Sequence, residues 1–98
     1  MVFMKNNRNN KYFLNISNKQ IKKHRLAQKF SLEKLSIKLM LLGIDISAQT
    51  LYNIEANKRT VTDFELCAIA KCLNLNPIEL LVDFEKYLDI YTQSDNLE

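Results

Sequence analysis

The sequence predicts an all-α fold, a compact domain of five helices that follows a flexible basic arm. The 98 residues include one glycine and one proline, and a β-sandwich or barrel would need many more of these turn-forming residues. Apolar residues recur at steps of three and four along much of the chain, which is the spacing of one face of a helix. A chain of this length is expected to form one domain around a single modest core.

Residues 1–16 are rich in asparagine and lysine, and this composition predicts a flexible arm. The arm carries three basic residues, Lys5, Arg8 and Lys11. Four apolar residues can anchor its end on the domain, namely Tyr12, Phe13, Leu14 and Ile16. The domain itself is expected to span residues 17–92, and residues 93–98 are expected to fray.

The first helix is predicted to begin after Ser17 and to run to about Gln28. Ser17 and Gln20 have the spacing of a capping box, in which two side chains satisfy free amides at a helix start. The inner side of this helix is expected to hold Ile21, Arg25 and Leu26.

The second helix is predicted to begin after Ser31, whose hydroxyl can accept a hydrogen bond from a free amide of the first turn. Its apolar residues recur at helical spacing, at Leu32, Leu35, Leu39 and Leu42. Gly43 fits the left-handed residue that ends many helices.

The third helix is predicted to begin after Ser47, with Leu51 and Ile54 facing inward. Ile46 and Leu51 have the spacing of a hydrophobic staple across that cap, which fixes the angle at which the chain enters the helix. Residues 57–61 then form a polar exit loop.

Two further helix starts follow. Thr62 and Glu65 have capping-box spacing, and the inward residues of this fourth helix are Leu66, Ile69, Ala70 and Leu73. Asn76, Pro77 and Glu79 fit the cap, the first position and the third position of a fifth helix. That helix is expected to run to about residue 92 with one apolar stripe, made of Leu80, Leu81, Phe84, Leu88 and Tyr91.

Charge is segregated along the chain. Residues 1–62 hold twelve Lys or Arg and three acids, a net charge of +9, whereas residues 63–98 hold two Lys and eight acids, a net charge of −6. A basic front half indicates an anionic partner such as nucleic acid. The alternative is that these charges only keep exposed faces solvated.

Several other classes of protein are disfavoured. The sequence has no Gly-rich phosphate loop, no catalytic Ser-His-Asp or His-Cys set and no metal-ligand spacing, so we expect no enzyme, no cofactor and no metal. Cys67 and Cys72 would point to different sides of a helix and are expected to be reduced core residues. No apolar run has the length of a membrane span and the N-terminus lacks a secretory segment, so a cytoplasmic location is expected.

Five stretches in order resemble one known family. They include a short basic helix, a Ser-capped helix and an Ile-Glu pair followed by Lys-Arg, and they cover residues 21–25, 31–36, 46–55, 66–74 and 76–81. Residues 20–81 resemble the phage-repressor and Cro family of helix-turn-helix DNA-binding domains, also called the xenobiotic-response-element type. The resemblance implies that the third helix reads DNA.

Three features depart from the family pattern. The connection from Leu35 to Ser47 is several residues longer, which requires a longer second helix or a larger loop. Leu32 stands where the family often has a glutamine that touches DNA. Asn57 follows the third helix where glycine is common, and asparagine tolerates the left-handed conformation.

The resemblance implies that outward side chains of the third helix contact base edges in the major groove. These candidates are Ala48, Gln49, Thr50, Tyr52 and Asn53. Gln49 and Asn53 can each form two hydrogen bonds to an adenine edge, and Ala48 can touch a thymine methyl group. The alternatives are a solvated polar face and, for Tyr52, packing on the long connection.

Phosphate contacts are expected from the rim of this surface, at Lys29, Ser31, Lys58 and Arg59. Weaker candidates are Lys22, Lys23, Lys34 and Lys38. The arm residues Lys5, Arg8 and Lys11 can enter the minor groove or follow the backbone, and the alternative is an arm without a role. Arg25 and Glu55 match a family ion pair that orients the first and third helices.

The implied function is a sequence-specific DNA-binding transcriptional regulator, a repressor that binds double-stranded DNA as a homodimer. A dimer is expected because one recognition helix reads few base pairs. Its candidate interface is on the fifth helix, at Phe84, Tyr87, Leu88, Ile90 and Tyr91, and the alternative is that these residues only close the core. The rival class is an antitoxin or another interaction module that binds a partner protein as well as DNA.

Overall fold

The computed structural model describes residues 14–96, except for the side chains of residues 91 and 93–96. Over this range the chain is all-α, as predicted, with five α-helices and no strand. The helices are α1 (Asn18–Ala27), α2 (Leu32–Leu41), α3 (Ala48–Glu55), α4 (Asp63–Cys72) and α5 (Phe84–Asn96), with a short 3-10 helix, η2, at Pro77–Leu80.

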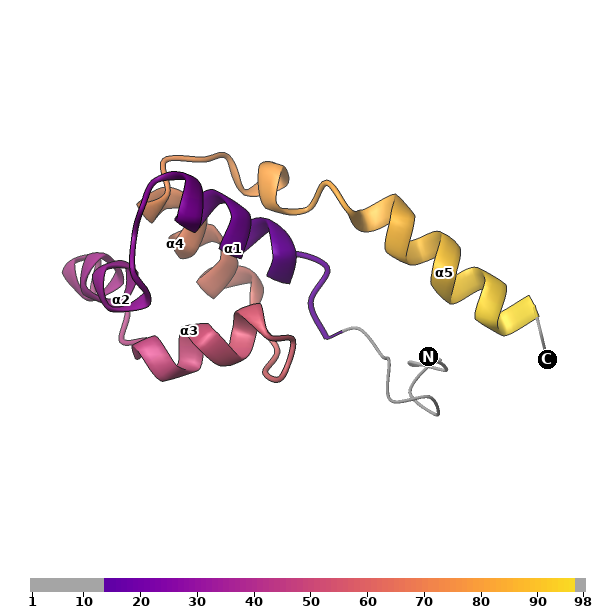
Figure 1. Ribbon diagram of the computed structural model, residues 1–98, viewed down its shortest axis with the longest axis horizontal. Coiled ribbons are helices and arrows are strands. Elements are labelled where there is room, and N and C mark those ends of the chain that lie inside the picture. The colour runs from indigo at the N-terminus through magenta and orange to yellow at the C-terminus, as the bar shows by residue number, and fades with distance from the viewer. Residues whose placement is uncertain (1–13, 97–98) are drawn as a thin grey trace.

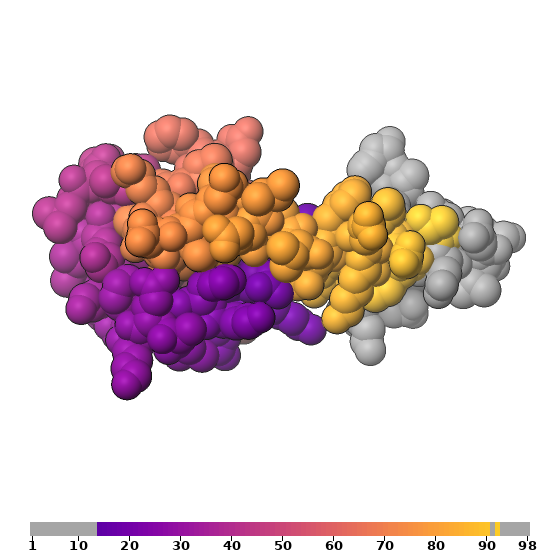
Figure 2. Space-filling model, turned by 90° about the horizontal axis from the view of Figure 1, so that it is seen from above, coloured from indigo at the N-terminus to yellow at the C-terminus, as the bar shows by residue number. Residues whose placement is uncertain are grey.

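Helices α1 to α4 and η2 form the body of the protein, and α5 extends away from it (Figure 1). Helix α3 packs against α1 and α2, α4 packs against α2, and η2 packs against α1 and α4. Seen from above, α1 and the segment around η2 lie side by side, and α5 continues beyond them (Figure 2). The centre of the core consists of completely buried apolar side chains, Ile21, Leu35, Leu39, Leu51, Ile54, Ile69, Leu73 and Leu80.

Three predicted helix starts are confirmed by their hydrogen bonds. The hydroxyls of Ser31 and Ser47 each accept from the amide three residues ahead, at 3.0 and 3.1 Å. Thr62 and Glu65 form the full capping box at the start of α4, with reciprocal bonds of 3.0 and 3.1 Å. Each bond satisfies an amide that the helix itself leaves free.

The predicted left-handed residues are also confirmed. Gly43 has a φ of 85° and Asn57 has a φ of 63°. Lys29 and Asn74 adopt the same conformation after α1 and α4, with φ values of 61° and 62°. The expected extra length between the second and third helices is shared, since α2 runs to Leu41 and a loop fills residues 42–47.

The capping box predicted at the start of α1 is wrong. The backbone of Ser17 lies in the helical region, with φ −91° and ψ −5°, and its side chain makes no capping bond. A capping side chain needs extended backbone in order to reach the amides of the first turn. Gln20 instead donates from Nε2 to Oδ2 of Asp83 at 3.2 Å, which ties α1 to the segment that precedes α5.

The single fifth helix predicted from Pro77 is also wrong, because two elements take its place. Asn76 and Glu79 do form the expected cap, but the helix that they start is 3-10 and ends at Leu80. The short turn places Leu80 completely inside the core, whereas Ile78 is 67% exposed. The chain then turns at residues 82–83, and α5 continues to Asn96, beyond the end that the sequence predicted near residue 92.

Three residues predicted to face inward are exposed. Leu26 is 54% exposed because Ile21 and Arg25 already occupy the inner face of α1. Leu42 is 43% exposed because it follows the last turn of α2. Cys67 is exposed and Cys72 is half-buried, and both are free thiols, so the core role predicted for the cysteines is wrong for Cys67.

Candidate nucleic-acid interface

Helix α3 has one buried side and one open side. Its inner residues Leu51 and Ile54 are completely buried. The residues predicted to read bases lie on the other side, where Gln49 and Tyr52 are exposed and three more are half-buried, Ala48, Thr50 and Asn53. The five candidates therefore share an accessible face that the core does not need.

The side chains on this face make only weak contacts with one another. Gln49 donates from Nε2 to Oδ1 of Asn53, one turn away, at 3.4 Å. A hydrogen bond this long and exposed is easily exchanged for a bond to a base edge. Thr50 differs, because its hydroxyl lies 3.0 Å from the capping hydroxyl of Ser47 and supports the start of the helix.

A buried ion pair sets the angle of this face. Nε of Arg25 donates to Oε2 of Glu55 at 2.7 Å, and Nη2 donates to Oε1 at 3.0 Å. Nη1 also donates to the carbonyl of Phe30 at 2.7 Å. The two side chains are only 8% and 5% exposed. Because both charges are shielded from water and fully hydrogen-bonded, the pair fixes α3 to α1 with defined geometry.

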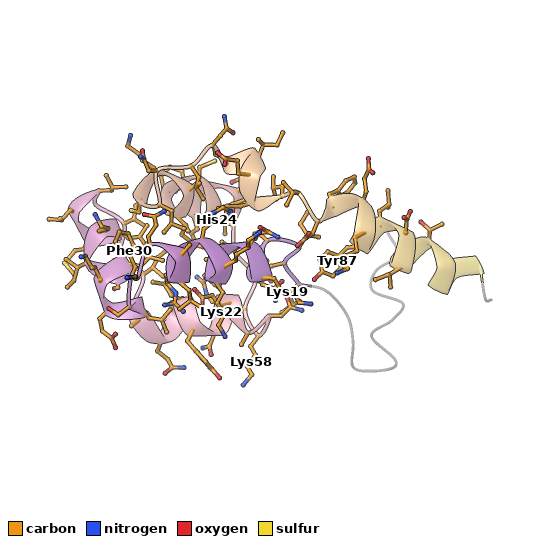
Figure 3. The ribbon with its side chains drawn as sticks, turned by 45° about the horizontal axis from the view of Figure 1, so that its top comes forward. Lys19, Lys22, His24, Phe30, Lys58 and Tyr87 are labelled. Atoms are coloured by element: carbon orange, nitrogen blue, oxygen red, sulfur yellow. The ribbon has the colours of Figure 1, made fainter. Side chains whose placement is uncertain are left out.

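The two basic residues of the exit loop differ in what they contact. Lys58 is exposed and points away from the body (Figure 3), and its Nζ lies 5.8 Å from the ring centre of Tyr52. Arg59 is bound to Glu65 of α4 through Nη1–Oε1 and Nη2–Oε2 bonds of 3.0 and 3.1 Å. The Arg59 guanidinium lowers the pKa of Glu65, and that carboxylate raises the pKa of Arg59. Lys58 is thus the more available cation of the loop.

Three asparagines hold the end of α3 and the exit loop, and the sequence did not predict this role. Asn15 is buried, donates from Nδ2 to the carbonyls of residues 54 and 59 at 3.3 and 2.8 Å, and accepts at Oδ1 from the amide of residue 61 at 2.8 Å. Oδ1 of Asn57 accepts from the amides of residues 14 and 15 at 3.1 and 2.9 Å. Nδ2 of Asn18 donates to the carbonyl of residue 55 at 3.2 Å.

This asparagine clamp, formed by Asn15, Asn18 and Asn57, was hidden by the composition around it. The many asparagines of residues 1–16 predict a flexible arm, and Asn15 lies inside that segment. The available signal was its place between Leu14 and Ile16, two apolar residues that were expected to anchor the chain. The clamp fixes the point at which the chain enters the body, directly beside the exit loop.

Basic residues also gather at the start of α2. Lys29 is exposed in a left-handed turn and Ser31 caps the helix. The Nζ atoms of Lys34 and Lys38 each lie 5.1 Å from the ring centre of Phe30. Lys29 and Lys34 therefore lie near the positive end of the helix dipole, where an anion is favoured, whereas Lys38 belongs to the last turn of α2.

A hollow lies where the first turn of α2 meets α3. It has a volume of about 290 Å³ and is lined by Leu32 and Glu33 of α2 and by Ala48, Gln49 and Tyr52 of α3. Three of the five residues that line it are candidate base readers. The hollow also includes Leu32, the residue that departs from the family pattern.

The remaining candidates lie on α5 and in the arm. Phe84, Leu88 and Ile90 are 52%, 44% and 41% exposed, but Tyr87 is only 8% exposed and lies at the root of α5 (Figure 3). The burial of Tyr87 favours, for this residue, the alternative that it only closes the core. The side chain of Tyr91 and the arm residues Lys5, Arg8 and Lys11 lie outside the described residues.

A helical body with a capped helix that presents open polar residues beside exposed cations is the arrangement expected of a helix-turn-helix DNA-binding protein. Residues 21–80 match the helix-turn-helix family, and this match covers more than half of the chain. The chain belongs to this family, in its Cro and phage-repressor form, and is a DNA-binding transcription regulator. Comparisons with curated proteins and with solved structures find no match.

Two further properties concern residues 14–96. Within this range, no three His, Cys, Asp or Glu side chains lie close enough to hold a metal ion. None of the helices in the same range combines the length and the apolar character that crossing a membrane requires.

Proposed function

We propose that this protein is a sequence-specific repressor of the xenobiotic-response-element type that places α3 in the major groove of its operator. The observation that carries the proposal is the open face of α3, where Gln49 and Asn53 present amides that no core contact requires. Such amides match the donor and acceptor pattern of adenine in the major groove. Ala48, Thr50 and Tyr52 complete the proposed reading surface.

Cations on both sides of α3 support the proposed phosphate contacts. Lys58 follows the helix at one end, and Lys29 and Ser31 stand at the start of α2. Arg59 belongs to the same rim, but a phosphate would have to share its guanidinium with the carboxylate of Glu65. The asparagine clamp supports a role for the arm, because Asn15 fixes its base beside the exit loop, and a chain as long as the segment that holds Lys5, Arg8 and Lys11 could extend from there to a bound duplex.

Exposed apolar residues on α5 support a homodimer. Phe84 and Leu88 stand one turn apart on a helix that extends from the body, and both are about half exposed. Tyr91 continues their spacing in the sequence. Pairing two such helices would bury this stripe and place two recognition helices on one duplex, as half-site recognition requires.

The same helix favours one alternative, an antitoxin-like module whose α5 binds a partner protein while α3 binds DNA. The acids Glu85 and Asp89 lie beside the apolar stripe and would suit a basic partner. The two proposals differ in stoichiometry. Purification of the chain from its native cells under gentle lysis would yield a basic protein in equal amount for the module, and a dimer of this chain alone for the repressor.

Selection of bound sequences from a pool of random duplexes tests the main proposal. A regulator that reads DNA as a dimer should enrich a motif with two-fold symmetry, whose half-sites are about one helical turn apart. A motif without symmetry would contradict the dimer, and a pool that stays random would contradict sequence-specific reading.

A further inference from the structure

We propose that the hollow between α2 and α3 is a binding site for the 5-methyl group of a thymine in the operator. The proposal rests on the proposed function and specifies which base the reading surface selects. The residues that line the hollow are the reason for choosing a methyl group as its occupant. Leu32 contributes an apolar wall from α2, and Ala48 and Tyr52 contribute a methyl group and a ring from α3. In the major groove the thymine methyl is the one apolar group that a base pair presents.

The charges around the hollow argue against a phosphate as its occupant. Glu33 is one of the residues that line the hollow, and its carboxylate would repel a phosphate oxygen. The nearby cations Lys34 and Lys38 lie over the ring of Phe30 and do not line the hollow. An apolar lining beside a carboxylate suits the edge of a base pair, since a carboxylate can also accept from an exocyclic amine.

Gln49 identifies the base pair that brings the methyl group. Gln49 lines the same hollow, and its amide can bond the N6 and N7 atoms of adenine. Every adenine is paired with a thymine, and both present their groups in the same groove. A single A·T base pair beneath α3 would therefore bond the amide of Gln49 through its adenine. The methyl group of its thymine would pack against Leu32. The proposal assigns Leu32, the residue that replaces a polar family contact, as a specificity-determining residue.

The first experiment removes only the methyl group. Each thymine of the enriched operator is replaced in turn by deoxyuridine, and the dissociation constant is measured with the full-length protein. One thymine per half-site should show a loss of about three- to fivefold, which corresponds to one buried methyl group. Replacement of the other thymines should change the constant by less than this, because those methyl groups remain in water.

A second experiment connects that methyl group to Leu32. At the sensitive position, the ratio of the dissociation constants for the deoxyuridine and thymine duplexes should fall to about one in Leu32→Ala. In Leu32→Met the ratio should stay close to that of the wild type. Leu41→Ala is the matched control, because Leu41 lies on the same helix, is 80% exposed and does not line the hollow. The thymine-to-deoxyuridine ratio is measured on one protein sample at a time, so partial unfolding of Leu32→Ala does not alter it. Tyr52→Ala provides a second test at an exposed position of the same lining.

The outcomes separate the two proposals. Binding of a defined sequence with no deoxyuridine effect, or with an effect that survives both Leu32→Ala and Tyr52→Ala, would overturn the thymine site and leave the regulator intact. Failure to enrich any sequence would overturn the regulator itself. An equal loss of the ratio in Leu41→Ala would show that the effect does not arise in the hollow.

Discussion

Gln49, Asn53 and Lys58 stand on the same open side of the protein but differ in their chemistry. The two amides can distinguish one base edge from another, because their donors and acceptors must match those of the base. The ammonium of Lys58 has no acceptor and is attracted to any phosphate. At the scale of single residues, reading and anchoring are therefore separable.

The first prediction compares these two kinds of residue. The double substitution Gln49→Ala with Asn53→Ala should reduce the preference for the operator over unrelated DNA, by about 1–3 kcal/mol for each lost pair of base contacts. Lys58→Ala should weaken binding to all sequences alike and reduce the slope of log affinity against log salt by about 0.9. Titrations of operator and scrambled duplexes at several salt concentrations measure both quantities. Identical behaviour of the two variants would contradict the assignment.

The second prediction concerns the buried ion pair. Glu55→Ala should lower the free energy of unfolding by about 3–5 kcal/mol, because it leaves the Arg25 guanidinium buried without its partner. Urea unfolding measures this change, with Asp45→Ala in the exposed loop before α3 as the control. Loss of DNA binding in Arg25→Ala would then report a disturbed fold. A loss of stability no larger than that of the control would show that the pair does not hold the two helices.

The third prediction concerns Glu65, whose ion pair with Arg59 would compete with the proposed phosphate contact of that arginine. Its pKa lies below the ordinary value of 4.5, so the carboxylate is charged at neutral pH and the pairing weakens only in acid, as the pH falls through that lowered pKa. Glu65→Gln keeps an oxygen for the Thr62 amide but removes the charge. Binding to all duplexes should become tighter and the salt slope steeper, as one more cation becomes available to phosphate. Asp63→Asn removes a charge in the same turn without freeing an arginine, and an equal gain in that variant would contradict the competition.

At the scale of helices, the sequence predicted the elements whose ends depend on local chemistry. Ser31, Ser47 and Thr62 each precede a helix and bond to an amide three residues ahead, and that geometry depends on a few neighbouring residues. Ser17 has the same sequence spacing but is buried, and contacts distant in the sequence decide its backbone conformation. The start and the core face of α4 were predictable because its cap and the spacing of its apolar residues lie within a few positions of one another. The break between η2 and α5 was not predictable in this way.

The break depends on where Leu80 is buried. A continuous helix from Pro77 would carry Leu80 and Phe84 on one stripe, but Leu80 is completely buried and Phe84 is 52% exposed. Helices α1 and α4 define the space that Leu80 fills, and no local pattern contains this information. The asparagine clamp escaped prediction for the same reason, since Asn15 bonds to residues about forty positions ahead of it in the sequence.

A fourth prediction tests the role of Leu80 as the residue that fixes η2. Leu80→Ala should lower the free energy of unfolding by about 2–5 kcal/mol, which is the cost of a buried cavity. Ile78→Ala, in the same short helix but 67% exposed, should change it by less than about 0.5 kcal/mol. Thermal or urea unfolding measures both values. Equal effects would contradict the different burial of the two side chains.

At the scale of the whole molecule, the two proposed surfaces lie on different parts of the protein. The body carries the proposed DNA surface, and α5 carries an apolar stripe away from it (Figure 1). The segregation of charge in the sequence indicated a different boundary, because the acidic rear begins at residue 63 and so includes α4 and η2 of the body. The sequence could not indicate that α5 extends away from the body, because the direction of α5 depends on the turn at residues 82–83.

The fifth prediction follows from this division. Phe84→Glu with Leu88→Glu should convert the proposed dimer into a folded monomer, because charged side chains would replace the buried stripe. Sedimentation should show half the mass, and affinity for a symmetric operator should fall while binding to one half-site persists. Lys86→Glu, an exposed change on the same helix, serves as the control. A wild-type protein that is already monomeric with and without DNA would contradict the interface.

The asparagine clamp also has a practical consequence for handling the protein. Because Asn15 and Asn57 secure the entering chain beside the exit loop, a bulky fusion placed ahead of residue 14 would be delivered next to the groove-facing side. The far end of α5 lies well away from α3 (Figure 1). An affinity tag or fluorophore for work with duplexes is better placed at the carboxyl terminus, beyond the residues of the proposed dimer stripe, where it would lie away from α3.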